Sequence, residues 1–183
     1  MTDQLTLHLG TRPNGAPSDV AIFSPDEVYR YWLTRELGGD VPLVCCGLNP
    51  STATAIKNDQ TITKDIGFAK RWGCGRVVKV NAYAFRATDP KVMKRAAKSG
   101  TDIVGPENDA YLRQAFELAV ELGGKILVAW GTNIDPARQC AIAELLAATP
   151  GAVAWTLKRN DNGTPSHELY IPYETPLIPW HCP

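Results

Sequence analysis

The chain has 183 residues, of which 44% are hydrophobic and 21% are charged, and its formal net charge at pH 7 is zero. This composition is typical of a soluble globular protein, and the length suits one domain with a sizeable core. No apolar run reaches the roughly 18 residues of a membrane span, and the N-terminus lacks the basic flank and apolar stretch of a signal peptide. We therefore expect one cytoplasmic domain over residues 1–183, without membrane association.

The five cysteines are odd in number, and no Cys-x-x-Cys spacing occurs. This pattern argues against a disulfide framework and against a structural zinc or iron–sulfur site. Cys45 and Cys46 lie in an apolar run, where a free cysteine packs as a small hydrophobe. The glycine-rich fingerprints of nucleotide-binding loops are absent, as is the Gly-x-Ser-x-Gly turn of many hydrolases. We therefore expect no metal and no cofactor.

Strand-like and helix-like patterns alternate along the chain. Residues 19–23 predict a short strand, and the Ser-Pro pair at 24–25 is typical of a helix start. That helix is expected to run to about Leu37. Residues 41–47 are an apolar run typical of a strand covered on both faces. The remaining elements are expected in this order: a helix over 62–72, a strand over 76–83, a basic loop over 91–98, a helix over 110–122, a strand over 125–130, a helix over 135–147, a strand over 153–157 and a loop-rich segment over 159–183.

This alternation predicts a three-layer α/β/α fold with a mostly parallel central sheet of about four strands. Residues 1–18 are expected to form an N-terminal arm, and residues 159–183 to contribute to a site. In such a sheet, ligands bind where the strands end at their carboxyl side. Polar residues that follow strands should therefore gather at one edge, namely Asn49, Asn81, Arg86, Asn133 and, from the last segment, His167.

The end of the second predicted strand is the most informative of these places. Gly47 and Pro50 stop the strand, and Asn49 favours a turn because a residue before proline is pushed out of the helical region. Ser51 and Thr52 then add two short hydroxyl side chains. Two interpretations remain open: a ligand-binding loop, or a plain strand-to-helix turn in which one hydroxyl caps the helix.

Charge is unevenly distributed along this neutral chain. Ten basic and two acidic residues fall between Lys64 and Lys98. A basic patch on a neutral protein suits a phosphate-binding face. Solvated lysines on helix surfaces give the same count. The patch therefore supports nucleic-acid binding without establishing it.

Several uncommon motifs occur in a fixed order. They are residues 47–53 (Gly-Leu-Asn-Pro-Ser-Thr-Ala), 59–61 (Asp-Gln-Thr), 81–90 (Asn-Ala-Tyr-Ala-Phe-Arg-Ala-Thr-Asp-Pro), 105–109 (Gly-Pro-Glu-Asn-Asp), 129–131 (Ala-Trp-Gly) and 163–170 (Gly-Thr-Pro-Ser-His-Glu-Leu-Tyr). Together they resemble the bacterial and phage family named domain of unknown function 1643, over roughly residues 20–180. The family label implies no activity.

The Gly-Leu-Asn-Pro motif that contains Asn49 also resembles the mismatch-specific branch of the uracil-DNA glycosylase superfamily, which has a parallel α/β/α sheet. That branch carries Gly-Ile-Asn-Pro-Gly after a strand, and its asparagine positions the attacking water. The resemblance implies that Asn49 holds this water, although Ser51 replaces the second glycine. Asn81 resembles an asparagine that some branches carry after the next strand. His167 resembles the start of a late His-Pro motif that contacts the base and the DNA backbone, with Glu168 in the place of the proline.

The glycosidic cleavage that this resemblance implies needs a positioned water and stabilisation of the departing base. His167 is expected to hydrogen-bond a base oxygen as negative charge develops there. Asp59 is expected to act as general base or, alternatively, only to begin a helix. Tyr83 or Phe85 would stack on an extruded base, or pack in the core as most strand aromatics do. The remaining substrate contacts are expected from Ser51, Thr52, Asn81, Arg86 and Asn133, with Arg86 and Lys91 on phosphates or, alternatively, in surface salt bridges.

The sequence thus predicts a glycosylase-like hydrolase acting on a nucleobase, with DNA or a nucleotide as its partner. A non-catalytic nucleic-acid or nucleotide-binding module of the same fold is one alternative, and another nucleotide-modifying enzyme is the other. Salt-dependent affinity separates a DNA binder from a small-nucleotide enzyme, because phosphate contacts weaken steeply with salt.

Overall fold

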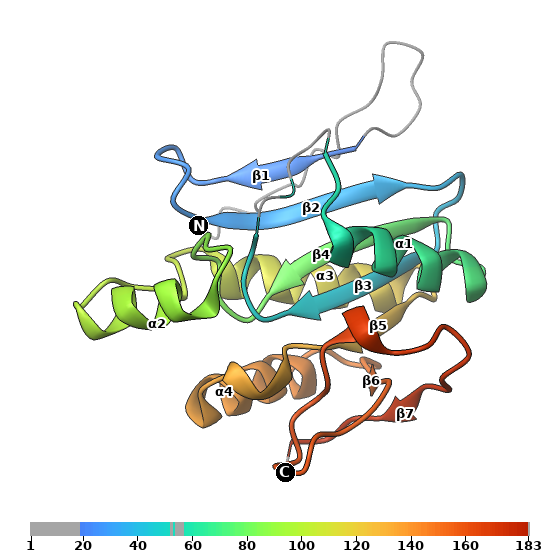
Figure 1. Ribbon diagram of the computed structural model, residues 1–183. Coiled ribbons are helices and arrows are strands. Elements are labelled where there is room, and N and C mark those ends of the chain that lie inside the picture. The colour runs from blue at the N-terminus through green and yellow to red at the C-terminus, as the bar shows by residue number, and fades with distance from the viewer. Residues whose placement is uncertain (1–18, 52, 54–56, 183) are drawn as a thin grey trace.

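The computed structural model describes residues 19–51, 53 and 57–182 of the chain. Within these ranges the chain forms strands, helices and two short 3-10 turns (Figure 1). The strands are β1 (Ala21–Phe23), β2 (Arg30–Glu36), β3 (Pro42–Gly47), β4 (Arg76–Asn81), β5 (Lys125–Val128), β6 (Ala154–Thr156) and β7 (Ile178–Pro179). The helical elements are α1 (Gln60–Arg71), α2 (Pro90–Lys98), α3 (Asn108–Glu121), η1 (Gly131–Asn133), α4 (Pro136–Ala147) and η2 (Glu168–Tyr170).

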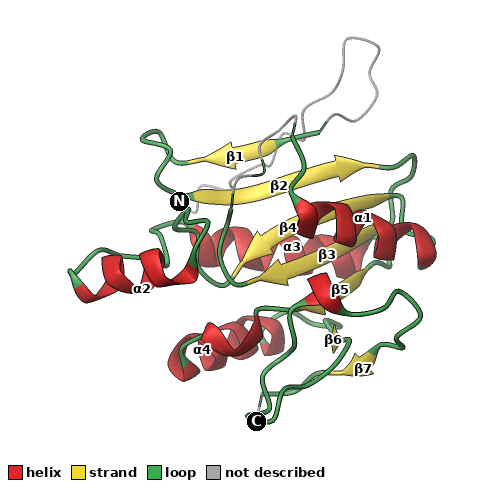
Figure 2. Cartoon of the chain, in the orientation of Figure 1, coloured by secondary structure: helices red, strands yellow, loops and turns green. Residues whose placement is uncertain are grey.

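All of these strands join one seven-stranded sheet in the order β1-β2-β4-β3-β5-β6-β7. The four central strands β4, β3, β5 and β6 are parallel, whereas β1, β2 and β7 pair antiparallel at the two edges. The α/β class is therefore confirmed, but the expected sheet of about four mostly parallel strands describes only its centre. Strands β1 and β2 extend the sheet beyond β4 on one side of that centre, and β7 extends it beyond β6 on the other (Figure 2).

The helix expected from residue 24 to Leu37 is wrong, because this segment turns and then forms β2. Ser24 starts a tight turn in which its hydroxyl donates to Asp26 and accepts from the backbone N–H of Tyr29. Glu27 has a φ of 56°, which a helix does not accommodate. The aromatic residues that follow favour a strand, and the local Ser-Pro signal was overridden by this pairing with the sheet.

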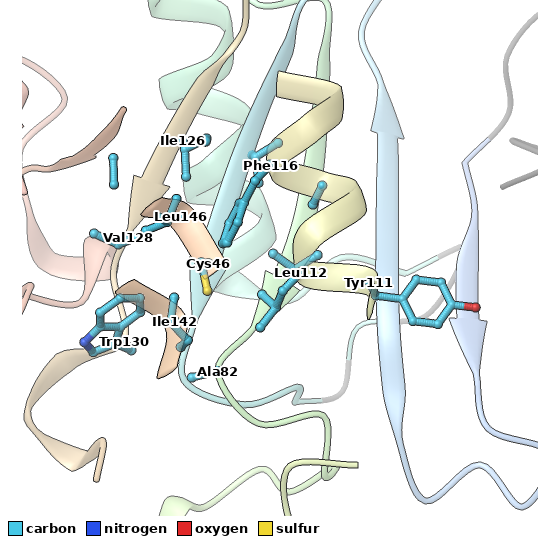
Figure 3. Packing of buried hydrophobic residues seen from close by; sticks show 14 of the residues in the cluster. Cys46, Ala82, Tyr111, Leu112, Phe116, Ile126, Val128, Trp130, Ile142 and Leu146 are labelled. Atoms are coloured by element: carbon cyan, nitrogen blue, oxygen red, sulfur yellow. The ribbon is translucent and has the colours of Figure 1, made fainter. Parts of the chain in front are cut away.

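Both faces of the central strands are buried, each under different helices. Val44 and Cys46 of β3 pack with Leu112 and Phe116 of α3 and with Ile142 of α4 (Figure 3). On the opposite face, alternate residues of the same strands pack with α1 and the C-terminal segment. The members of that second cluster include Leu43, Cys45, Phe68, Ala69, Val77 and Leu127. This alternation gives three layers and explains why β3 reads as an uninterrupted apolar run.

The basic loop expected over residues 91–98 is instead the helix α2. Asp89 caps it by accepting a hydrogen bond from the backbone N–H of Lys91, and Pro90 occupies the first turn. Both are favourable helix-start features. The many lysines and arginines of this segment favoured the prediction of a loop, although its helix cap is an ordinary one. None of the helices in the described part of the chain is long and apolar enough to cross a membrane.

Candidate ligand-binding site

A cavity of about 610 Å³ opens at the carboxyl ends of the central parallel strands. The chain places β4 on one side of β3 and β5 on the other, so the strand order reverses between β3 and β5. Open α/β sheets bind ligands in the crevice at such a reversal. The segments that follow β3, β4, β5 and β6 all contribute walls to this cavity.

Most of the residues expected to form the site line this cavity. Those lining it are Asn49, Ser51, Asp59, Asn81, Asn133 and His167. Tyr83, Phe85, Arg86 and Lys91 are not among its lining residues. Thr52 lies outside the described residues. The expectation that polar strand ends converge at one edge is therefore met for the asparagines and for His167.

The side chain of Asn49 is held in one orientation by the main chain. Its amide nitrogen donates to the carbonyl of Ala87 at 2.7 Å and to that of Pro50 at 3.1 Å. These two bonds use both N–H groups of the amide. The carbonyl oxygen Oδ1 therefore remains as the acceptor that Asn49 presents to a ligand or a water.

Asn81 ends β4 and is almost fully buried beside the same cavity. Its amide nitrogen has no hydrogen-bond partner among the described residues. A buried donor without an acceptor costs free energy, so its position at a cavity wall favours a ligand acceptor there. Gly47 makes room for this side chain, since a Cβ at Gly47 would lie 3.1 Å from Asn81 Oδ1 and 3.2 Å from Lys79 Nζ.

Asp59 begins a helix and also lies at the cavity, so its position suits both of its expected roles. Its carboxylate caps α1 by accepting from the backbone N–H of Ile62 at 2.9 Å, and the residue also lines the cavity. The helix-start interpretation is therefore seen directly. One carboxylate oxygen is engaged in the cap, and the carboxylate has further acceptor capacity for a water.

Tyr83 and the two residues Phe85 and Arg86 lie elsewhere than the expected site. Tyr83 is buried in the core, and its hydroxyl accepts from the backbone N–H of Asp135 at 3.0 Å. Phe85 and Arg86 line a second, more open cavity of about 460 Å³. Arg86 lies 3.6 Å from the carboxylate of Glu27, as the surface salt-bridge alternative predicts.

A buried charge cluster that the sequence did not indicate lies under the cavity. Lys79 Nζ lies 2.6 Å from Glu168 Oε1 and 3.0 Å from Asp65 Oδ2, and all three side chains are almost fully buried. Lys79 lines the cavity, and Asp65 comes from α1. Glu168 Oε2 in turn lies 3.2 Å from Nδ1 of His167. A chain of polar contacts thus connects the protein interior to a residue of the cavity wall.

The pKa values of the three residues in this cluster are shifted in different ways. Burial raises the pKa of Asp65 to about 8, even though Lys79 opposes the shift. Burial also acts against the charges of Lys79 and Glu168, but their mutual attraction outweighs it, raising the pKa of Lys79 and lowering that of Glu168. At neutral pH the cluster therefore contains one ammonium, one carboxylate and one protonated carboxyl, and is close to neutral.

His167 Nδ1 accepts a hydrogen bond from the backbone N–H of Leu169 at 3.2 Å. In the neutral ring this contact places the proton on Nε2, which makes Nε2 a donor. His167 is therefore equipped to donate from Nε2 to a ligand oxygen.

Basic residues gather on α2, next to the cavity mouth. Pro90 at its first turn lines the cavity, and Lys94 Nζ donates to Asn133 Oδ1 at 2.9 Å across that mouth. The other basic side chains of this helix are exposed; they are Lys91, Arg95 and Lys98. The basic residues between Lys64 and Lys98 therefore do not form one surface. Lys79 is buried, and Arg76 is ion-paired at the far end of β4.

No three His, Cys, Asp or Glu side chains within the described ranges are arranged to hold a metal ion. The cavity walls instead offer amides, hydroxyls and one imidazole, together with buried cations. This set reads hydrogen-bonding edges and binds anions.

Comparison with known families gives one match. A family model described as "Protein of unknown function (DUF1643)" matches residues 30–169. The chain belongs to the DUF1643 family. Searches among curated proteins and among solved structures found no match. The matched span includes β2, the Asn49 turn and Glu168. Every residue that lines the cavity of this DUF1643 chain, except Tyr170, lies within the family region.

Sequence reasoning assigned no site role to several residues of this family member. They include Arg30, Thr61, Lys79 and Tyr170 at the cavity, and Asp65 and Glu168 in the charge cluster under it. One signal was available for Lys79, because a lysine inside an apolar strand covered on both faces must find a buried partner. The partners themselves come from distant segments, and only the folded chain brings them together.

Proposed function

We propose that the cavity binds a nucleobase and that the protein is a glycosylase-like hydrolase, acting on a nucleobase in DNA or in a nucleotide. The fixed orientation of Asn49 is the observation that carries the proposal. Its amide nitrogen is bound to two main-chain carbonyls, and Oδ1 is left to accept a hydrogen from water. The parallel centre of the sheet also agrees with the arrangement that the resemblance to uracil-DNA glycosylases implies.

In this reaction a water attacks C1′ of the sugar as the bond from C1′ to the base nitrogen breaks. The bonding electron pair leaves with the base, which becomes an anion stabilised by donors aimed at its oxygen. His167 Nε2 and the unpartnered amide nitrogen of Asn81 are two such donors at the cavity. The water loses a proton to Asp59 or to solvent, and the base anion is then protonated.

The expected nucleic-acid partner has a surface to contact beside the cavity. Lys91, Lys94, Arg95 and Lys98 project from α2 without an acidic residue on the same helix. Side chains of this type position phosphates and carry no sequence information. A strand whose target base enters the cavity would then run past α2.

The non-catalytic binding module remains the second candidate because of Asp59. One oxygen of its carboxylate is engaged in the α1 cap, so the structure gives this residue a role that needs no catalysis. In that case the same amides and His167 would read a base without cleaving it. An enzyme of another reaction type on a nucleotide would use the same pocket.

Incubation with oligonucleotides that carry uracil, mismatched thymine or modified pyrimidines tests the proposal by formation of abasic sites. We expect cleavage that falls by about a hundredfold in Asn49→Ala, the loss typical of removing one preorganised group. Asn162→Ala changes an asparagine outside the cavity and should cleave normally. Salt-sensitive binding without cleavage of any base would contradict catalysis and support the binding module.

A further inference from the structure

Arg30 is a buried cation that lines the cavity without an ion-pair partner among the described residues. Its side chain is 2% exposed. Nη1 donates to the carbonyl of Ala53 at 2.7 Å, and Nε has no hydrogen-bond partner among the described residues. A guanidinium has five N–H donors, so most of this one's capacity is unused.

None of the described residues forms an ion pair with Arg30. Of the residues outside the described ranges, only Asp3 is acidic. Burial lowers the pKa of Arg30 to about 10, with Asp59 opposing this effect and Arg86 and Arg35 adding to it. The group therefore keeps its charge at neutral pH, in a place where neighbouring charges are mostly of the same sign.

A buried charge without a partner is costly, and removing it from water is repaid only by an opposite charge in good geometry. The planar guanidinium fork matches phosphate oxygens and binds them with two parallel hydrogen bonds. Ser51 and Thr61 bring hydroxyl groups to the same cavity. The position of Arg30 fits an anion that enters with the ligand.

We infer that Arg30 forms a phosphate subsite inside the cavity, which selects a phosphorylated nucleotide over a free base or nucleoside. The inference rests on the proposed function for the base, while the phosphate contact itself depends only on Arg30. The phosphate belongs either to a mononucleotide or to a strand, and the chemistry of recognition is the same. It differs from the α2 surface, which is exposed to solvent.

Calorimetric titration of the full chain with inorganic phosphate, a pyrimidine nucleoside, its monophosphate and a short oligonucleotide tests the subsite. We expect the monophosphate to bind about tenfold to a hundredfold more tightly than the nucleoside, the gain typical of charge-assisted hydrogen bonds. Arg30→Met should abolish this difference and the binding of inorganic phosphate. Arg35→Met is the matched control, since Arg35 is a buried arginine of the same strand that does not line the cavity.

Arg30→Lys keeps the charge but loses the fork, and should retain part of the phosphate affinity; it also provides a folded variant if Arg30→Met does not fold. Binding of the nucleoside and the monophosphate with equal, measurable affinity would overturn the subsite and leave the proposed function standing. Binding of inorganic phosphate that depends on Arg30, with no measurable binding of nucleoside or nucleotide, would support the phosphate contact and contradict the proposed function. Oligonucleotide binding without mononucleotide binding would assign the phosphate to a strand.

Discussion

The two ends of the central sheet treat buried charge differently. At the amino end of β4, Arg76 Nε lies 3.5 Å from Glu36 and Nη2 lies 3.3 Å from Asp40. At the carboxyl end, Arg30 has no such partner among the described residues, and the amide nitrogen of Asn81 has no acceptor there. Because β2 and β4 are neighbours, both arginines belong to one strand pair. Ion pairs thus compensate the buried arginine at the amino end, whereas Arg30 and Asn81 at the carboxyl end keep donors for the ligand that we propose.

The largest effect is expected in the Lys79–Asp65–Glu168 cluster, which lies under the cavity. Lys79→Met removes the cation that two buried carboxyl groups share, so we expect a loss of about 3–5 kcal/mol of unfolding free energy. Urea denaturation measures it. The double variant Lys79→Met with Glu168→Gln should recover part of the loss, because it leaves no unpaired buried carboxylate. No loss in the single variant would mean that the cluster does not stabilise the fold.

The next effect compares the two arginines directly. Arg76→Met removes the cation that lies 3.5 Å from Glu36 and should cost about 2 kcal/mol, less than a fully buried pair because Asp40 is exposed. Arg30→Met removes an uncompensated charge and should change stability by less than about 1 kcal/mol, the value of its one hydrogen bond. Thermal and urea unfolding of both variants without ligand measures the difference. Equal losses would contradict the contrast between the two ends.

The pH dependence of stability tests the Lys79–Asp65–Glu168 cluster in another way. Asp65 has a folded pKa of about 8 against 3.8 in the unfolded chain, so the folded state holds its proton over this range. The free energy of unfolding should therefore fall as pH rises from about 4 to about 8. Asp65→Asn keeps a neutral group and should remove this part of the slope. A wild-type slope retained in the variant would show that another group titrates.

The smallest effect on stability is expected at the rim of the cavity. Tyr170 lines the cavity and is 87% exposed, so Tyr170→Ala should change unfolding free energy by no more than about 0.5 kcal/mol. Its exposed ring suits stacking on a base, which is worth about 1–3 kcal/mol. We therefore expect nucleotide affinity to fall about tenfold or more. Val153→Ala, an exposed apolar residue outside this cavity, should alter neither quantity.

Much of the parallel centre follows from local patterns in the sequence. The apolar run at β3 and the helices near α3 and α4 were expected close to where they lie, because periodicity and strong end signals agree there. Asn49, Asn81 and Asn133 could be placed at one edge from the strand ends alone. These predictions needed no knowledge of tertiary contacts.

The remaining parts depend on contacts between distant segments. The helix signal at Ser24 competed with sheet pairing, and β2 formed because its aromatic residues pack beside β4. Lys79 and Glu168 are 89 residues apart and become a pair only in the folded chain. Glu168 stands where the resemblance has a proline, and its buried ion pair gives this position a structural role that no local pattern predicts.

A crystal structure of the protein with a pyrimidine nucleoside monophosphate most directly tests the claim that the carboxyl end is kept for a ligand. We expect the phosphate within hydrogen-bond distance of the Arg30 guanidinium, and a base oxygen on the amide nitrogen of Asn81. A ligand bound in this way would supply acceptors to Arg30 and Asn81, whose Nε and Nδ2 have no hydrogen-bond partner among the described residues. A nucleotide bound elsewhere on the molecule, with Arg30 and Asn81 still uncontacted, would contradict the account.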